Sequence, residues 1–153
     1  MKEDVFQTKS PEQTEAVGAS LAAKMEGDAS LPRFVALYGD LGVGKTAFVR
    51  GFASIFCENA AVRSPTFALV NEYRGKQTRL FHFDMYRITD EDDLYSIGYD
   101  DYLAREGIIL TEWSENIPFA LPDERIEVRI SKDSPEDPDS RSIRILAVKE
   151  PLC

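Results

Sequence analysis

The chain has 153 residues, which favours one domain over residues 1–153 and leaves little room for a separate substrate-binding or DNA-binding domain. Its 18 basic and 27 acidic residues give a formal net charge of −9, which argues against autonomous binding of DNA or RNA. The two cysteines, Cys57 and Cys153, lack a metal-binding spacing, and no apolar run approaches the ~18 residues needed to span a bilayer. We therefore expect a cytoplasmic protein without a zinc site, a disulfide framework or a membrane segment.

The first predicted element is a helix that begins after Ser10 and ends near Gly27. Ser10 suits the N-cap, Pro11 suits the first helical position, and Gln13 completes a capping box. Apolar side chains recur every four residues along this helix, at Val17, Leu21 and Met25.

A phosphate-binding loop follows the next element, an apolar strand predicted at 34–38. The loop has the pattern of a glycine, four residues and Gly-Lys-Thr, in Gly39, Asp40, Leu41, Gly42, Val43, Gly44, Lys45 and Thr46. Its glycines let backbone N–H groups converge on phosphates, Lys45 supplies a positive charge to them, and the Thr46 hydroxyl can ligate Mg²⁺. Residues 47–56 then read as an amphipathic helix. The combination predicts a protein that binds a nucleoside triphosphate.

The rest of the chain predicts further strands with short helices between them. Residues 67–73 and 78–85 read as a β-hairpin, 90–105 as short helices that end by Gly107, and 108–111 as a buried central strand. Alternating apolar residues predict two more strands near 126–130 and 143–147. The polar, proline-containing segment 131–140 between them is expected to be a solvated, mobile loop.

A phosphate loop also needs a carboxylate near its Mg²⁺, usually at the end of a neighbouring strand. Asp84 and Glu112 both follow apolar runs, and the pattern alone does not rank them. Thr66 lies where a switch loop could sense the γ-phosphate, although an ordinary turn into a strand explains it equally well. His82, the single histidine, is expected to be a packed, hydrogen-bonded residue and not a metal ligand.

Four motifs in one order give the chain a recognisable signature. They are the loop at 39–46, Ser64-Pro65-Thr66-Phe67, His82-Phe83-Asp84-Met85-Tyr86-Arg87 and Glu112-Trp113-Ser114-Glu115. With these motifs the chain resembles the TsaE (YjeE) family over nearly its whole length. The resemblance implies an α/β, three-layer fold of the P-loop NTPase type, with a mostly parallel central sheet, an antiparallel hairpin and C-terminal antiparallel strands.

The resemblance also implies an activity and partners. Members of the family are bacterial cytoplasmic ATPases needed to make N6-threonylcarbamoyladenosine at position 37 of tRNA. They act with the TsaD and TsaB proteins, so this chain would meet tRNA only through that complex. We expect slow, partner-dependent hydrolysis of ATP with Mg²⁺.

The roles of individual residues follow from the same resemblance. Lys45 would contact phosphate, Thr46 and Glu112 would bind Mg²⁺, and Asp84 would orient or deprotonate the attacking water. Three residues would form a switch or support the site, namely Thr66, Trp113 and Glu115. The chain departs from the family at Ser114, where proline is common, and at Ala47, where a hydroxyl residue is frequent. Neither change removes a charged group.

Three other functions are compatible with the loop alone. A GTPase would typically carry Asn-Lys-x-Asp, but Asn59, Asn71 and Asn116 precede Ala60, Glu72 and Ile117. A small-molecule kinase would need an acceptor pocket and an arginine-bearing lid, and a nucleotide-gated adaptor would bind ATP without turnover. For the base itself, Thr14 and Arg141 are weakly supported candidate contacts.

Overall fold

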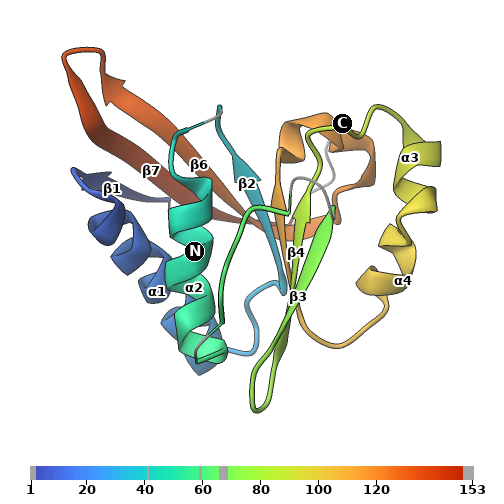
Figure 1. The fold of residues 1–153 in the computed structure, drawn as a ribbon. Helices are drawn as coiled ribbons and strands as arrows, with labels where there is room; N and C mark the ends of the chain where they lie inside the picture. Colours follow the sequence, from blue (N-terminus) through green and yellow to red (C-terminus); the bar gives the residue numbers. More distant parts are fainter. Residues whose placement is uncertain (1–2, 41, 59, 66–68, 150–153) are drawn as a thin grey trace.

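The computed structural model describes residues 3–40, 42–58, 60–65 and 69–149, and shows a seven-stranded mixed sheet with helices on both faces (Figure 1). The strand order is β1-β7-β6-β2-β5-β4-β3. The strands are β1 (Asp4–Thr8), β2 (Phe34–Tyr38), β3 (Val70–Arg74), β4 (Arg79–Asp84), β5 (Ile108–Glu112), β6 (Glu124–Ser134) and β7 (Asp137–Lys149).

The centre of the sheet is parallel and its two edges are antiparallel. Strands β6, β2, β5 and β4 run parallel to one another. The β3–β4 hairpin extends one edge, and β7 and β1 extend the other, in antiparallel pairings. The predicted fold class is confirmed, including the antiparallel hairpin and the C-terminal antiparallel strands.

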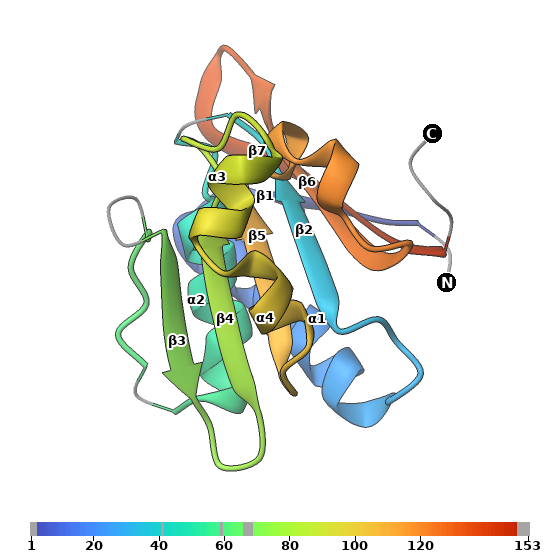
Figure 2. The ribbon, with the colours of Figure 1, turned by 90° about the vertical axis from the view of Figure 1, so that its right-hand side faces the viewer.

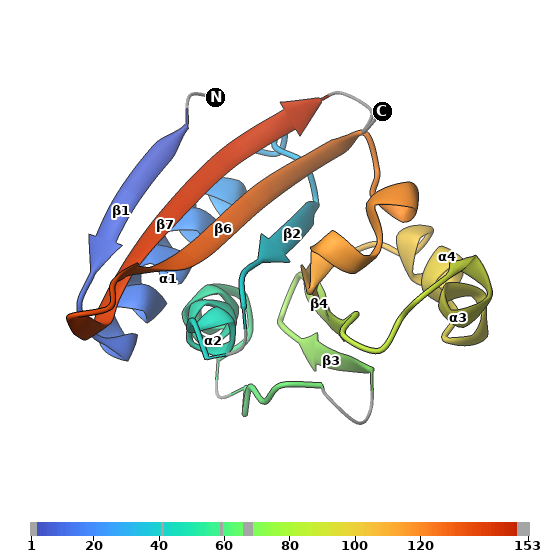
Figure 3. The same cartoon turned by 90° about the horizontal axis from the view of Figure 1, so that it is seen from above.

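Helices cover both faces of the sheet. The helices α1 (Pro11–Gly27) and α2 (Lys45–Phe56) pack on one face. The short helices α3 (Glu91–Ser96) and α4 (Tyr99–Leu103), with the 3₁₀ turns η1 (Ser114–Asn116) and η2 (Pro118–Ala120), cover the other (Figures 2 and 3). None of the helices in the described residues combines the length and the apolar character needed to cross a membrane.

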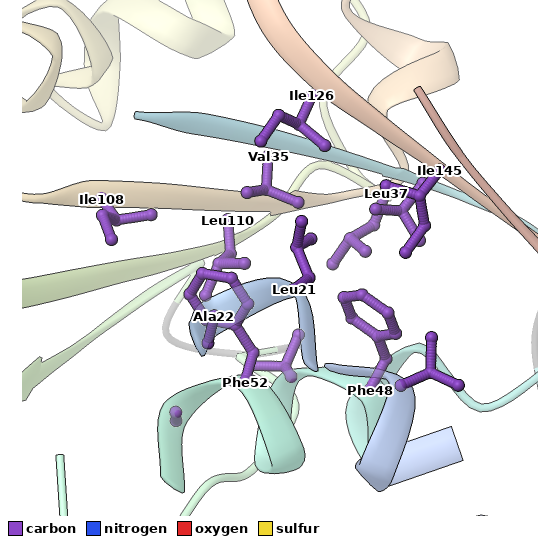
Figure 4. Packing of buried hydrophobic residues seen from close by; sticks show 14 of the residues in the cluster. Leu21, Ala22, Val35, Leu37, Phe48, Phe52, Ile108, Leu110, Ile126 and Ile145 are labelled. Atoms are coloured by element: carbon purple, nitrogen blue, oxygen red, sulfur yellow. The ribbon is translucent and has the colours of Figure 1, made fainter. Parts of the chain in front are cut away.

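The alternation of side chains along β2 explains why this strand is apolar throughout. Val35 and Leu37 point into a core shared with Leu21, Phe48 and Phe52, among others (Figure 4). Phe34, Ala36 and Tyr38 join the second core, which lies beneath α3 and α4. Because both faces are covered, all five residues of β2 are buried, as expected for a central parallel strand.

The N-terminal helix begins as its capping residues predict. The Ser10 side chain accepts a hydrogen bond from the backbone N–H of Gln13, and the Gln13 side chain accepts one from Lys9 N–H at 2.7 Å. Only the first half of the predicted capping box therefore forms, because Gln13 binds the N–H of the residue before the N-cap and not that of Ser10. Along the predicted apolar stripe, Val17, Leu21 and Met25 are all buried.

The prediction of a mobile loop at 131–140 is wrong. Strands β6 and β7 continue through this segment as one long hairpin with its turn at 135–136, and Ser131 pairs with Ser142 and Ser134 with Asp137. Backbone pairing satisfies this polar stretch without apolar side chains, so hydrophobic alternation does not reveal it. The edge strand β1, which pairs with β7, was also missed because its five residues carry little pattern.

Two glycines allow α1 and α2 to approach closely. A Cβ atom on Gly18 would lie 2.1 Å from the carbonyl oxygen of Phe48, and one on Gly51 would lie 1.8 Å from the carbonyl oxygen of Glu15. Neither obstacle is a flexible side chain, so a methyl group at either position would force the two helix backbones apart.

We therefore expect Gly51→Ala to lower the free energy of unfolding by about 1–3 kcal/mol, even though alanine favours helix over glycine. Gly27→Ala is the matched control, because a Cβ there meets nothing within 4 Å. Urea denaturation of both variants measures the effect. If Gly51→Ala is as stable as Gly27→Ala, the close backbone approach is wrong.

Candidate active site

The parallel strands bring the predicted site residues to one edge of the sheet. The carboxyl end of β2 leads into the loop at 39–44 and then into α2, and the ends of β5 and β4 lie beside it (Figure 1). Asp84 and Glu112 are the last residues of their strands and are direct register partners. The carboxyl ends of parallel strands are where α/β proteins place their ligands.

The loop backbone depends on its three glycines. Gly39, Gly42 and Gly44 have φ values of 146°, 77° and 104°, in a range that favours glycine. A Cβ on Gly39 would also lie 2.5 Å from the carbonyl oxygen of Ile130. Gly44 is the N-cap of α2 and has no side-chain capping bond, so the first N–H groups of this helix are free of side-chain acceptors at the cap. Such a helix start suits a phosphate group.

The Lys45 side chain reaches back across the loop to Gly39, its first residue. Its side chain is buried, and Nζ donates a hydrogen bond to the Gly39 carbonyl at 2.6 Å and lies 3.9 Å from the centre of the Trp113 ring. Burial lowers the pKa of the Lys45 ammonium, while the negative charges of Glu112, Glu115, Asp84 and Asp40 oppose this change. Lys45 is therefore a desolvated cation near several carboxylates, and its position in the loop allows it to contact phosphate.

Glu112 is held by His82. The Glu112 side chain is buried, and its Oε2 pairs with His82 Nε2 at 2.5 Å. His82 is completely buried, and its Nδ1 lies 3.4 Å from the Tyr73 hydroxyl. The prediction that His82 is a packed, hydrogen-bonded residue is confirmed, but its partner was not foreseen. The contact orients the carboxylate and leaves Oε1 for another ligand.

Asp84 is a buried carboxylate whose position favours proton acceptance. Its side chain is 5% exposed, and Oδ1 accepts a hydrogen bond from the Tyr86 backbone N–H at 2.9 Å. Burial raises the pKa of the Asp84 carboxyl, the neighbouring Glu112 acts in the same direction, and the Tyr86 hydrogen bond and Lys45 act against them. A carboxylate with a raised pKa is a better general base near neutral pH.

The donor set fits a Mg²⁺ ion that is shared with phosphates. Among the described residues, no three His, Cys, Asp or Glu side chains converge as a metal-binding group. Mg²⁺ usually takes one or two protein ligands and completes its shell with phosphate oxygens and water. Thr46, half-buried in the first turn of α2, and the Oε1 atom of Glu112 are oxygen donors of the type required.

Trp113 and Glu115 also lie at this edge. Trp113 has a left-handed backbone, with φ 59° and ψ 42°, and its ring packs on Tyr86 with the centres 5.0 Å apart. Glu115 Oε2 accepts a hydrogen bond from Gly39 N–H at 3.3 Å. The structure thus brings both residues against the loop. Leu41 and Thr66 lie outside the described residues, so their predicted roles stay predictions.

Sequence reasoning missed the way Arg141 meets the loop, and it missed the hydrogen-bond partner of Thr14, which lies on β1. Arg141, from β7, donates Nε–H to the Val43 carbonyl at 2.9 Å and Nη2–H to the Gly42 carbonyl at 3.3 Å. Thr14 Oγ1 lies 2.9 Å from Thr8 Oγ1. The contacts of Arg141 are with the backbone of the loop, and no local sequence pattern indicates them.

Comparisons with known proteins agree with one another. The model of the family described as "Threonylcarbamoyl adenosine biosynthesis protein TsaE" matches residues 8–143. The Bacillus subtilis tRNA threonylcarbamoyladenosine biosynthesis protein TsaE is 37% identical over 97% of this chain and 88% of its own. The Haemophilus influenzae protein of the same name is 39% identical over 74% of this chain and 69% of its own. The crystal structure of Bacillus subtilis YdiB superposes with a TM-score of 0.73 at 32% identity, over 96% of this chain and 86% of that one.

The raised pKa of Asp84 predicts a pH-dependent gain in stability for Asp84→Asn. Well below pH 4 the carboxyl is protonated in both the folded and the unfolded chain, so no anion is buried on folding. As the pH rises through the higher folded pKa, the wild type alone loses stability. At pH 7.5 the variant should therefore melt at a higher temperature than the wild type, and this difference should shrink as the pH falls toward 4.

Thermal melts of the ligand-free protein between pH 4 and pH 8 measure this difference. Glu106→Gln removes an exposed carboxylate and should leave the melting temperature nearly unchanged across the range. A melting temperature for Asp84→Asn equal to or below that of the wild type at pH 7.5 would contradict the burial argument.

Proposed function

This chain belongs to the TsaE family, and from that premise we propose that it binds ATP with Mg²⁺ in the loop at 39–46 and hydrolyses ATP slowly. The hydrolysis would support formation of N6-threonylcarbamoyladenosine at position 37 of tRNA. The observation that carries the proposal is the convergence of Lys45, Asp84 and Glu112 beside one glycine-rich loop: the two carboxylates end neighbouring strands as register partners, and Lys45 donates a hydrogen bond to the first residue of the loop.

Each residue has a physical task in this proposal. The backbone N–H groups of the loop and the start of α2 bind the phosphates, and Lys45 leaves the Gly39 carbonyl to contact the β- and γ-phosphates. Thr46 and Glu112 hold Mg²⁺, which neutralises charge on the phosphates when it is bound. Asp84 orients the attacking water or accepts its proton, because burial keeps this carboxylate basic.

The choice of ATP over GTP rests on the sequence, which has no Asn-Lys-x-Asp motif for guanine. The partners in this proposal are the TsaD and TsaB proteins, with tRNA held by the complex. A net charge of −9 fits a chain that leaves tRNA to its partners.

Slow turnover by the isolated chain follows from the contacts of two arginines near the site. The Arg129 guanidinium stacks on Tyr38 at 4.0 Å and pairs with Glu127 at 3.2 Å. The guanidinium of Arg141 is engaged by backbone carbonyls. A partner that supplied a further positive charge to the transition state would raise the rate.

Displacement of a fluorescent ATP analogue tests the nucleotide site. We expect ATP with Mg²⁺ to displace the analogue well below the GTP concentration required, and Lys45→Ala to abolish binding. Asp84→Asn should bind ATP within about threefold of the wild type but lose phosphate release by roughly 10²–10⁴-fold.

Trp113 is the single tryptophan, so its fluorescence emission should change when ATP binds and Lys45 moves off its ring. A preference for GTP, or a nucleotide affinity of Lys45→Ala equal to that of the wild type, would contradict the proposal. Lys76→Ala, in the β3–β4 turn, is the control.

Phosphate release in the presence of TsaB and TsaD tests the link to the tRNA modification. We expect the rate to rise at least about tenfold when both proteins are added, because they would complete stabilisation of charge in the transition state. The same addition to Asp84→Asn should give no increase. A wild-type rate that is already rapid alone, and that ignores both proteins, would contradict this part of the proposal.

A further inference from the structure

A single guanidinium joins the β6–β7 hairpin to the phosphate-binding loop. Arg141 lies near the tip of the hairpin, and its backbone is paired on both sides, with Lys132 on β6 and Thr8 on β1. Its side chain donates Nε–H to the carbonyl oxygen of Val43 at 2.9 Å and Nη2–H to that of Gly42 at 3.3 Å. The partners are 98 and 99 residues away along the chain.

The remaining contacts of Arg141 fix the guanidinium itself. Nη1 donates to the carbonyl oxygens of Pro138 at 2.5 Å and Ser140 at 2.9 Å, both in the same hairpin. Four N–H···O=C contacts therefore engage a group that has five N–H donors. With four of its five N–H donors engaged by carbonyl oxygens, the guanidinium is held in one orientation against the loop.

Because of the geometry of the peptide unit, these contacts also set the direction of N–H groups on the other side of the loop. In a trans peptide, the carbonyl of one residue and the N–H of the next point in opposite directions. No cis peptide occurs among the described residues. When Arg141 holds the carbonyls of Gly42 and Val43 on its own side, the N–H groups of Val43 and Gly44 are directed away from it. Within the part of the chain that the structure describes, Val43 N–H makes a long hydrogen bond, 3.4 Å to the Asp40 carbonyl.

We propose that Arg141 is a positioning residue for the nucleotide: by binding the Gly42 and Val43 carbonyls, it fixes the Val43 and Gly44 N–H groups in the orientation that receives phosphate. This inference rests on the proposed binding of ATP. Gly42 and Gly44 have positive φ values and little steric restraint, so the loop needs an external contact to hold one conformation. Arginine suits this task because its rigid fork reaches two adjacent carbonyls at once, whereas lysine presents one flexible ammonium.

The effect should fall on nucleotide affinity and not on the chemical step. A preorganised loop contacts phosphates of both ATP and ADP, so its loss weakens the two ligands to a similar extent. We expect Arg141→Gln to raise the Kd of each nucleotide roughly tenfold, as for the loss of one well-formed hydrogen-bonding arrangement. The kcat at saturating ATP should stay within about threefold of the wild type.

The matched control is Arg144→Gln, which removes the same charge from an exposed position three residues along β7. Its nucleotide affinity should equal that of the wild type. Arg141→Lys tests whether affinity depends on the positive charge or on the shape of the guanidinium, because lysine keeps the charge but cannot bind two carbonyls with one rigid group. A similar loss of affinity in Arg141→Lys supports the proposal, and full recovery of affinity would overturn it in favour of a simple electrostatic effect.

Three measurements test the proposal. Calorimetric titration gives the affinities for ATP and ADP, far-UV circular dichroism checks that each variant folds, and hydrogen exchange reports on the Gly44 amide. Faster exchange at Gly44 in folded Arg141→Gln, together with the weaker binding, supports the proposal. Wild-type affinity in folded Arg141→Gln overturns it, and if that variant does not fold, the affinity of Arg141→Lys decides. Failure of the wild type itself to bind ATP would instead reject the proposed function.

Discussion

The parallel alignment of β4 with β5 and of β5 with β2 determines where the reactive groups of this protein lie. It places Asp84 opposite Glu112 and puts both beside the turn that carries Lys45. Because helices cover both faces of the sheet, these three side chains are buried as well as adjacent. Burial lowers the pKa of Lys45 and raises that of Asp84, and the adjacent charges modify both changes.

Placing charges in such a site is costly, and the structure reduces the cost by pairing them. Lys45 faces the carboxylates and the Trp113 ring, and Glu112 is hydrogen-bonded to His82. The remaining electrostatic cost falls on Asp84, because burial and the nearby Glu112 both raise the pKa of its carboxyl. A cation such as the proposed Mg²⁺ would relieve the repulsion between the two carboxylates. This explains why the site tolerates two buried acids on neighbouring strands.

The parts of the fold that sequence could predict are those set by local pattern. The helix after Ser10, the strand at 34–38 and the phosphate loop all depend on residues close together in the chain, so capping, periodicity and glycine placement reveal them. The polar hairpin at 131–140 and the short edge strand β1 are stabilised by backbone pairing to distant segments. Residue type carries almost no signal for such pairing.

The candidate site likewise contains residues that local sequence pattern predicts and contacts that it does not. Lys45 and Thr46 can be read from the loop motif, but Asp84 and Glu112 are equivalent candidates until the resemblance to a family separates their roles. Their adjacency, and the contact between His82 and Glu112, follow from strand register, which a single sequence does not specify. Arg141 is the extreme case, because its partners are almost a hundred residues away and are backbone atoms that any residue could supply.

The loop is therefore supported by segments from the whole length of the chain. Ile130 of β6 lies so close to Gly39 that only glycine fits, and Glu115 accepts the Gly39 N–H. Arg141 holds the next turn of the loop from β7, while α1 packs closely against the helix that follows it. A backbone rich in glycine has many accessible conformations, and these contacts select one of them. The hairpin that looks like a polar loop in the sequence is thus a structural support of the glycine-rich loop at 39–46, and its length allows Arg141 to reach that loop.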